Sequence, residues 1–141
     1  MKNNIELVRH SLSHLMAAAV LEIWPDALPT LGPATETGFY YDFEFSSPVS
    51  EKDFTKIENK MRQIAKTWKE FEGKEISYED AKKLFAKNPY KLELIEEINK
   101  DSQKITTYTS GEFTDLCRGD HTDDMSKMPL DIWRLERVAG A

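Results

Sequence analysis

Two pairs of residues with useful chemistry stand far apart in this chain. The segment "HSLSH", residues 10–14, carries His10 and His14, and "DLCRGDH", residues 115–121, carries Cys117 and His121. The two members of each pair are four positions apart, and the two pairs hold all three histidines and the one cysteine of the chain. Imidazole and thiolate groups bind zinc, and imidazole is also a common general base. The pattern leaves three interpretations: a shared zinc site, a metal-free hydrolytic pocket, or unrelated side chains.

The first pair belongs to an expected helix. Apolar residues recur at spacings of three and four over residues 7–24, and Pro25 ends the run. His10 and His14 lie one turn apart on it, so they share a face. A Pro- and Gly-rich loop is expected over residues 25–37, and "GFYYDFEF", residues 38–45, is typical of a strand.

The middle of the chain is rich in charged residues and is predicted to be largely helical. Ser50 with Asp53, and Ser77 with Asp80, resemble helix-capping pairs. The helix after Ser50 is expected to extend to Trp68, whereas residues 90–98 have an ambiguous period. Strands are expected at residues 71–77, in a hairpin over 104–116, and at 129–140. These elements predict an α+β fold, a helix-covered antiparallel sheet in a two-layer sandwich, with an inserted helical lobe at roughly residues 50–95.

Composition limits the function further. The 141 residues suffice for one domain, and 40% hydrophobic with 31% charged residues is ordinary for a globular protein. No apolar run is long enough to cross a membrane, and residues 1–14 lack the apolar core expected of a signal peptide. A single cysteine suits a reducing compartment, which favours the cytoplasm. The net charge of -6 argues against a general nucleic-acid binder, although a local site for nucleic acid remains compatible with it.

Several motifs together resemble the editing domain of bacterial threonyl-tRNA synthetase. They are "RHSLSHLMAAAV", "WPDA", "LGPATETGFYYDF", "FTKIENKMRQIAK", "YKLELI", "GEFTDLCRGDH" and "VAGA". The resemblance covers essentially all of residues 1–141. Alanyl-tRNA editing proteins look similar around the two pairs, but "GFYYDF" and "YKLELI" favour the threonyl family. The resemblance implies hydrolysis of mischarged seryl-tRNA(Thr), with the aminoacylated 3′ end of tRNA(Thr) and the catalytic core of a parent synthetase as partners.

The resemblance also implies roles for seven residues. His10 would handle the attacking water, Lys91 would supply a cation near the ester, and Asp115 would bind the amine or hydroxyl of serine. The remaining four would line the substrate pocket: His14, Tyr41, Cys117 and His121. Neither Lys91 nor Asp115 is expected to support the core, because charged residues are rarely buried without partners.

The family pattern favours a pocket without metal, so zinc held by His10, His14, Cys117 and His121 is the less favoured alternative. Asp120 departs from the pattern, which has proline before the last histidine. Its carboxylate could raise the pKa of His121, orient its ring or simply point to solvent. Two other functions stay open. One is a free-standing editing protein of the alanyl type, and the other is a metal-stabilised module that binds tRNA ends without hydrolysis. The chain is expected to be one module of a larger synthetase.

Overall fold

The computed structural model describes residues 4–30, 38–46, 49–68, 72–111, 113–116 and 135, with only the backbone of residues 4–7. Four α-helices, a short 3-10 turn and five strands lie in these ranges. In chain order they are α1 (Asn4–Ile23), β1 (Leu28–Pro29), β2 (Phe43–Glu44), η1 (Glu51–Asp53), α2 (Phe54–Ala65), β3 (Glu72–Ile76), α3 (Tyr78–Leu84), α4 (Pro89–Lys100), β4 (Ile105–Ser110) and β5 (Phe113–Leu116). The expected α+β class is therefore confirmed.

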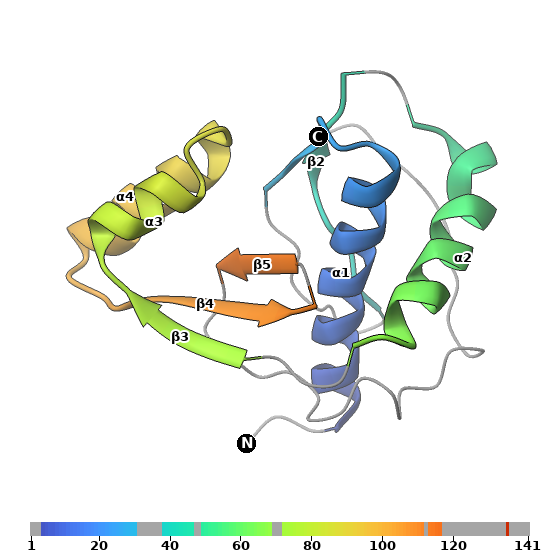
Figure 1. The fold of residues 1–141 in the computed structure, drawn as a ribbon, viewed down its shortest axis with the longest axis horizontal. Coiled ribbons are helices and arrows are strands. Elements are labelled where there is room, and N and C mark those ends of the chain that lie inside the picture. The colour runs from blue at the N-terminus through green and yellow to red at the C-terminus, as the bar shows by residue number, and fades with distance from the viewer. Residues whose placement is uncertain are drawn as a thin grey trace.

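The five strands form two separate antiparallel sheets. The short strands β1 and β2 pair as a ribbon, with Leu28 opposite Glu44 and Pro29 opposite Phe43. The larger sheet has the order β3-β4-β5, and β4 and β5 form the expected hairpin around Ser110 and Gly111. Figure 1 shows this sheet between two helical groups, with α1 and α2 on one side and a lobe of α3 and α4 on the other.

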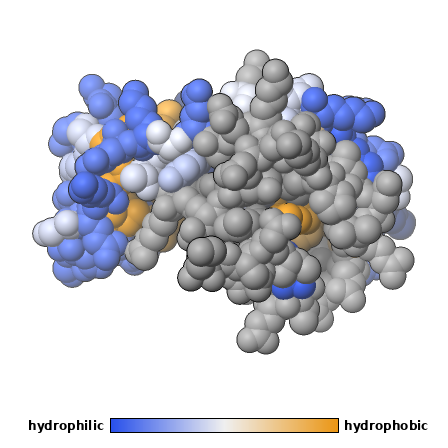
Figure 2. Space-filling view, turned by 90° about the horizontal axis from the view of Figure 1, so that it is seen from below, coloured by the Kyte–Doolittle hydropathy of each residue, from blue (hydrophilic) through white to orange (hydrophobic). Residues whose placement is uncertain are grey.

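Each helical group has its own hydrophobic cluster. The larger cluster joins α1 and α2 and includes Leu15, Met61 and Phe113. The smaller cluster lies under α3 and α4 and includes Ala81, Ile95 and Ile105. On the face of the α3–α4 lobe that Figure 2 shows, most of the surface is hydrophilic. Strand β5 touches both clusters, because Phe113 packs in the larger one and Leu116 against the smaller one.

Local capping chemistry defines the helix starts. Ser50 and Asp53 form a reciprocal capping box at η1, and the Ser77 hydroxyl accepts from the Asp80 N–H at the start of α3. Both expected capping pairs are thus confirmed. Residues 90–98, ambiguous in sequence, belong to α4, which begins at Pro89 after the cap residue Asn88.

Three expected elements differ in extent. The strand expected over residues 38–45 is reduced to Phe43–Glu44, because its partner β1 is also only two residues long. The second helix ends at Ala65, and Trp68 turns inward instead to stack on Phe113, with ring centroids 6.0 Å apart. The strand expected over residues 129–140 lies outside the described residues except for Leu135, which packs against the larger cluster.

Candidate active site

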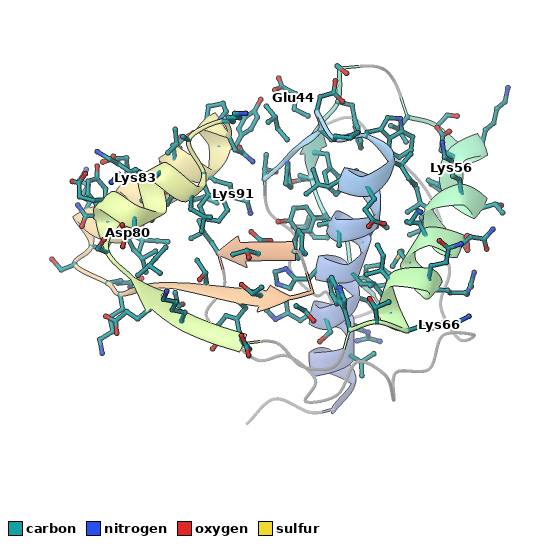
Figure 3. All side chains as sticks on the ribbon, in the orientation of Figure 1. Glu44, Lys56, Lys66, Asp80, Lys83 and Lys91 are labelled. Atoms are coloured by element: carbon teal, nitrogen blue, oxygen red, sulfur yellow. The ribbon has the colours of Figure 1, made fainter. Side chains whose placement is uncertain are left out.

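Five of the seven candidate residues lie together where the two hydrophobic clusters meet. His10 and His14 come from α1, Tyr41 precedes β2, Lys91 is in the first turn of α4 and Asp115 is on β5. Figure 3 places Lys91 on the part of α4 that faces the rest of the molecule. The other two candidates, Cys117 and His121, lie outside the described residues, as does Asp120.

Asp115 is the centre of the group. Its Oδ1 lies 2.7 Å from the Lys91 ammonium, and its Oδ2 accepts a short hydrogen bond from the Tyr41 hydroxyl. The same Oδ2 lies 3.2 Å from Nδ1 of His14. Lys91 also donates to the Tyr41 hydroxyl, over 2.9 Å. Carboxylate, ammonium and phenol therefore form a closed triangle, and His14 is attached to its carboxylate corner.

Burial makes these pairs energetically important. Lys91 and Asp115 are each only 3% exposed, and His14 is 4% exposed. An ion in such surroundings is costly unless paired, and the loss of one partner leaves the other charge uncompensated. Lys91 and Asp115 are thus both buried and paired with each other, so their contribution to the core becomes a matter for experiment. Their sequence neighbours gave no sign of burial, because the partners that make it tolerable come from distant segments.

The carboxyl of Asp115 is held in its ionised form. Burial by itself raises its pKa, because desolvation disfavours the charge, but the contacts with His14 and Lys91 outweigh that effect. The net result lowers the pKa of Asp115 from 3.8 to about 2. The site therefore carries a buried carboxylate at neutral pH.

The two histidines continue the chain of contacts toward the surface. Nε2 of His14 lies 3.2 Å from Nε2 of His10, and the ring centroids are 4.9 Å apart. His10 is only partly buried, so it is the member of the pair nearer to solvent. The ionised Asp115 faces Nδ1 of His14, and in the tautomer with its proton on Nδ1, Nε2 of His14 accepts from an N–H of His10.

The same arrangement also suits two ligands of one zinc ion. Tetrahedral bonds of 2.0–2.1 Å place two nitrogens about 3.3 Å apart, and a carboxylate behind a ligating histidine is a common supporting feature. Within the described ranges, no group of three or more His, Cys, Asp or Glu side chains is arranged to hold a metal. A zinc site here would need Cys117 or His121, which the structure does not describe.

Asn88 is a buried polar residue near this site that the sequence interpretation missed. It is 8% exposed and caps α4, three residues before Lys91. The signal was the segment "NPY", in which an N-cap residue precedes a proline at the first helical position. That signal predicts a helix start. It does not indicate that the Asn88 side chain also forms a hydrogen bond to a distant strand.

Comparison with known proteins gives a consistent result. The chain is similar to one segment of threonine–tRNA ligases. It is 46% identical over 133 residues to the enzyme of Borrelia duttonii, 44% over 135 residues to that of Rubrobacter xylanophilus, and 42% over 139 residues to that of Dehalococcoides mccartyi. These alignments cover 94%, 96% and 99% of this chain. No protein-family model matches it.

The similarity concerns a part of those relatives. The chain spans 23%, 20% and 23% of the three ligases, about a fifth of their length. It therefore corresponds to a domain-sized segment of such a ligase. None of the helices in the described part of the chain has the length and hydrophobicity needed to cross a membrane.

Proposed function

We propose that this chain hydrolyses the ester of mischarged seryl-tRNA(Thr), as the editing domain of a threonyl-tRNA synthetase. The observation that carries the proposal is the continuous set of polar contacts from Lys91 through Asp115 and His14 to His10. These residues come from three elements and span more than a hundred positions of sequence. A buried ion pair joined through the buried His14 to the partly exposed His10 is a suitable arrangement for ester hydrolysis.

The reaction answers a limit of amino-acid selection. Serine lacks one methyl group of threonine, and a pocket gains only about 1–3 kcal/mol from such a group. A site that selects threonine therefore also charges some serine. A second site that hydrolyses the smaller product removes the error. The similarity to threonine–tRNA ligases over about a fifth of their length supports a domain with this accessory task.

Asp115 and Lys91 are assigned to the amino acid and to the ester. The ionised Asp115 carboxylate would attract the ammonium group of the seryl moiety. Lys91 would then stabilise the negative charge that develops on the ester carbonyl oxygen when water adds to it. The Tyr41 hydroxyl, which contacts both groups, would hold their separation and share in substrate contact.

His10 is assigned to the attacking water. In its neutral form, with Nε2–H directed at His14, the lone pair of His10 is on Nδ1, which would accept the proton of the water. The adduct then collapses: the bond from the carbonyl carbon to the ribose oxygen breaks, and that oxygen takes up the proton that His10 removed from the water. His14 orients His10 through the same contact. Cys117 and His121 are proposed to complete the pocket wall, and the hydrolysis is proposed to proceed without metal.

Deacylation of three substrates tests the proposal. The purified protein should release serine from seryl-tRNA(Thr) and leave threonyl-tRNA(Thr) intact. Faster hydrolysis of seryl-tRNA(Ala) would favour an alanyl-type editing protein. Binding of tRNA ends without any hydrolysis would favour the non-catalytic module. Stoichiometric zinc by elemental analysis, with activity lost in a chelator and regained with zinc, would overturn the metal-free mechanism.

A further inference from the structure

The position of Lys91 depends on how the α3–α4 lobe meets the rest of the molecule. Lys91 lies on α4, and the hydrophobic residues of α4 pack in the smaller cluster. Tyr41 belongs to the larger cluster, and the ring of His14 lies beside the ring of Tyr41. Hydrophobic packing is not directional, so it fixes the separation of two clusters less sharply than a short hydrogen bond does. A specific polar contact between them is therefore the feature that would set the distance from Lys91 to Tyr41.

Asn88 forms the N-terminal cap of α4. Its Oδ1 accepts from the backbone N–H of Tyr90 over 3.1 Å and from that of Lys91 over 3.2 Å. Its own carbonyl accepts the first helical hydrogen bond, from the N–H of Leu92. The Asn88 side chain is thus bonded directly to the backbone of the residue whose ammonium enters the site.

The other end of the same amide reaches a different element. Nδ2 of Asn88 donates to the carbonyl oxygen of Pro29, on β1, over 2.7 Å. The amide has only one orientation that satisfies both ends, because a flipped amide would face N–H groups with its nitrogen and a carbonyl with its oxygen. Strand β1 pairs with β2, and Tyr41 lies two residues before β2. Asn88 therefore connects the backbone of Lys91 to the ribbon that carries Tyr41.

We propose that Asn88 is a positioning residue for Lys91: it fixes the first turn of α4 against β1, so that the ammonium reaches Tyr41 and Asp115. Asn88 touches neither the carboxylate nor the phenol in the described contacts and acts through Lys91. Its consequence for the reaction rate rests on the proposed function, whereas its consequence for the Lys91 ammonium does not.

Two substitutions distinguish the hydrogen bond of Asn88 to Pro29 from the capping of α4 by the same side chain. Asn88→Ser keeps an acceptor that caps a helix well, but its side chain is too short to reach Pro29. Asn88→Asp keeps the cap and the shape, and places a carboxylate oxygen against the Pro29 carbonyl. Ser77→Ala is the matched control, because it removes the cap of α3 in the same lobe without touching β1.

The first measurement is single-turnover deacylation of seryl-tRNA(Thr), well below the unfolding temperature of each variant. Asn88→Ser should lower the maximal rate by about tenfold or more with the KM little changed, since small misplacements of a reacting group are costly. Asn88→Asp should do the same, and Ser77→Ala should keep the parental rate. In a Lys91→Ala background, Asn88→Ser should cause no further loss. Equal rates for Asn88→Ser and Ser77→Ala would overturn the proposal.

The second measurement does not depend on activity. The side-chain ¹⁵N–H signal of a buried, hydrogen-bonded lysine ammonium exchanges slowly with water and can be observed by NMR. That of Lys91 should be visible in the parental protein and in Ser77→Ala, and should be lost in Asn88→Ser. If the signal survives in Asn88→Ser, the positioning role is wrong. If the parental protein does not hydrolyse seryl-tRNA(Thr) but the signal behaves as expected, the proposed function fails and the positioning role stands.

Discussion

At the scale of single residues, the buried pair of Lys91 and Asp115 has two consequences, one for the rate and one for stability. Lys91→Ala should lower single-turnover deacylation about 10²–10³-fold, as the loss of one charge-stabilising donor does elsewhere. It should also destabilise the fold by roughly 3–5 kcal/mol, because Asp115 stays buried without its cation. Urea unfolding followed by circular dichroism measures the second effect beside the first.

A double substitution distinguishes the two effects. Lys91→Met with Asp115→Leu removes both charges and should regain part of the stability lost in Lys91→Met alone. Activity should stay lost, because the charges themselves are absent. If Lys91→Ala unfolds in urea at the parental midpoint, then the pair does not support the core.

The ionised Asp115 also gives the fold a defined sensitivity to acid. Its folded pKa of about 2 lies below the ordinary 3.8, so the folded state binds the proton more weakly than the unfolded state. The stabilisation is therefore complete above about pH 4 and is lost as the pH falls through about 2, in total on the order of 2 kcal/mol. Urea midpoints between pH 5 and pH 2 should fall more steeply in the parental protein than in Asp115→Asn. Parallel curves would contradict the assignment.

At the scale of elements, two residues have a left-handed backbone conformation, and their substitutions should change stability in opposite directions. Gly111, in the β4–β5 turn, has a φ of 60°, and a Cβ there would lie 2.8 Å from Nε1 of Trp68. Gly111→Ala should destabilise the protein by about 2–3 kcal/mol, from backbone strain and from displacement of the indole. The measurement is thermal or urea unfolding. A change below half of that value would mean that the turn relaxes freely.

Ser102, after the end of α4, has a φ of 57°. This left-handed conformation is unfavourable for a residue with a Cβ atom. The N–H of Gln103 reaches the carbonyl of Ile98, as in a helix end that glycine usually terminates. Ser102→Gly should therefore raise the free energy of unfolding, by about 0.5 kcal/mol. Differential scanning calorimetry of the two variants side by side would show a lower Tm for Gly111→Ala and a higher one for Ser102→Gly.

These elements also mark what local sequence could predict. The capping pairs at Ser50 and Ser77 and the turn at Gly111 were identifiable because their chemistry lies within four residues. The end of α2 was not, since Trp68 leaves the helical path to stack on Phe113, forty-five positions later in the chain. Local periodicity contains no information about such a distant partner.

The candidate site likewise has features that the sequence predicts and features that it does not. Pairing of His10 with His14 follows from helical spacing alone. The positions of Tyr41, Lys91 and Asp115 came from the family resemblance, and their mutual contacts could not be derived from spacing. Asn88 was readable as a helix cap, but its bond to Pro29 joins residues 59 positions apart and becomes visible only in three dimensions.

At the scale of the whole molecule, charge predicts weak binding of nucleic acid. The net charge is -6, and the Lys56 ammonium lies over the ring of Trp24, 5.7 Å from its centroid. Lys66, just after the end of α2, points outward from that helix (Figure 3). The isolated chain should bind tRNA with a Kd above about 1 µM at physiological salt, because an acidic chain offers little net positive charge for neutralising phosphates. Fluorescence titration with labelled tRNA measures this. A submicromolar Kd would show that the chain carries its own tRNA-binding surface.

The order of the five described site residues along the chain has a consequence for synthesis on the ribosome. The chain grows from its N-terminus, so α1 and α2 can pack while the later segments are still being made. Lys91 is translated before Asp115, and during that interval the ammonium has no carboxylate to enter the interior with. A nascent chain stopped before β5 should therefore leave the Lys91 ammonium in water, even where Asn88 already holds α4 against β1. Burial of that ammonium, and any hydrolytic activity, would wait until residue 115 has left the ribosomal tunnel.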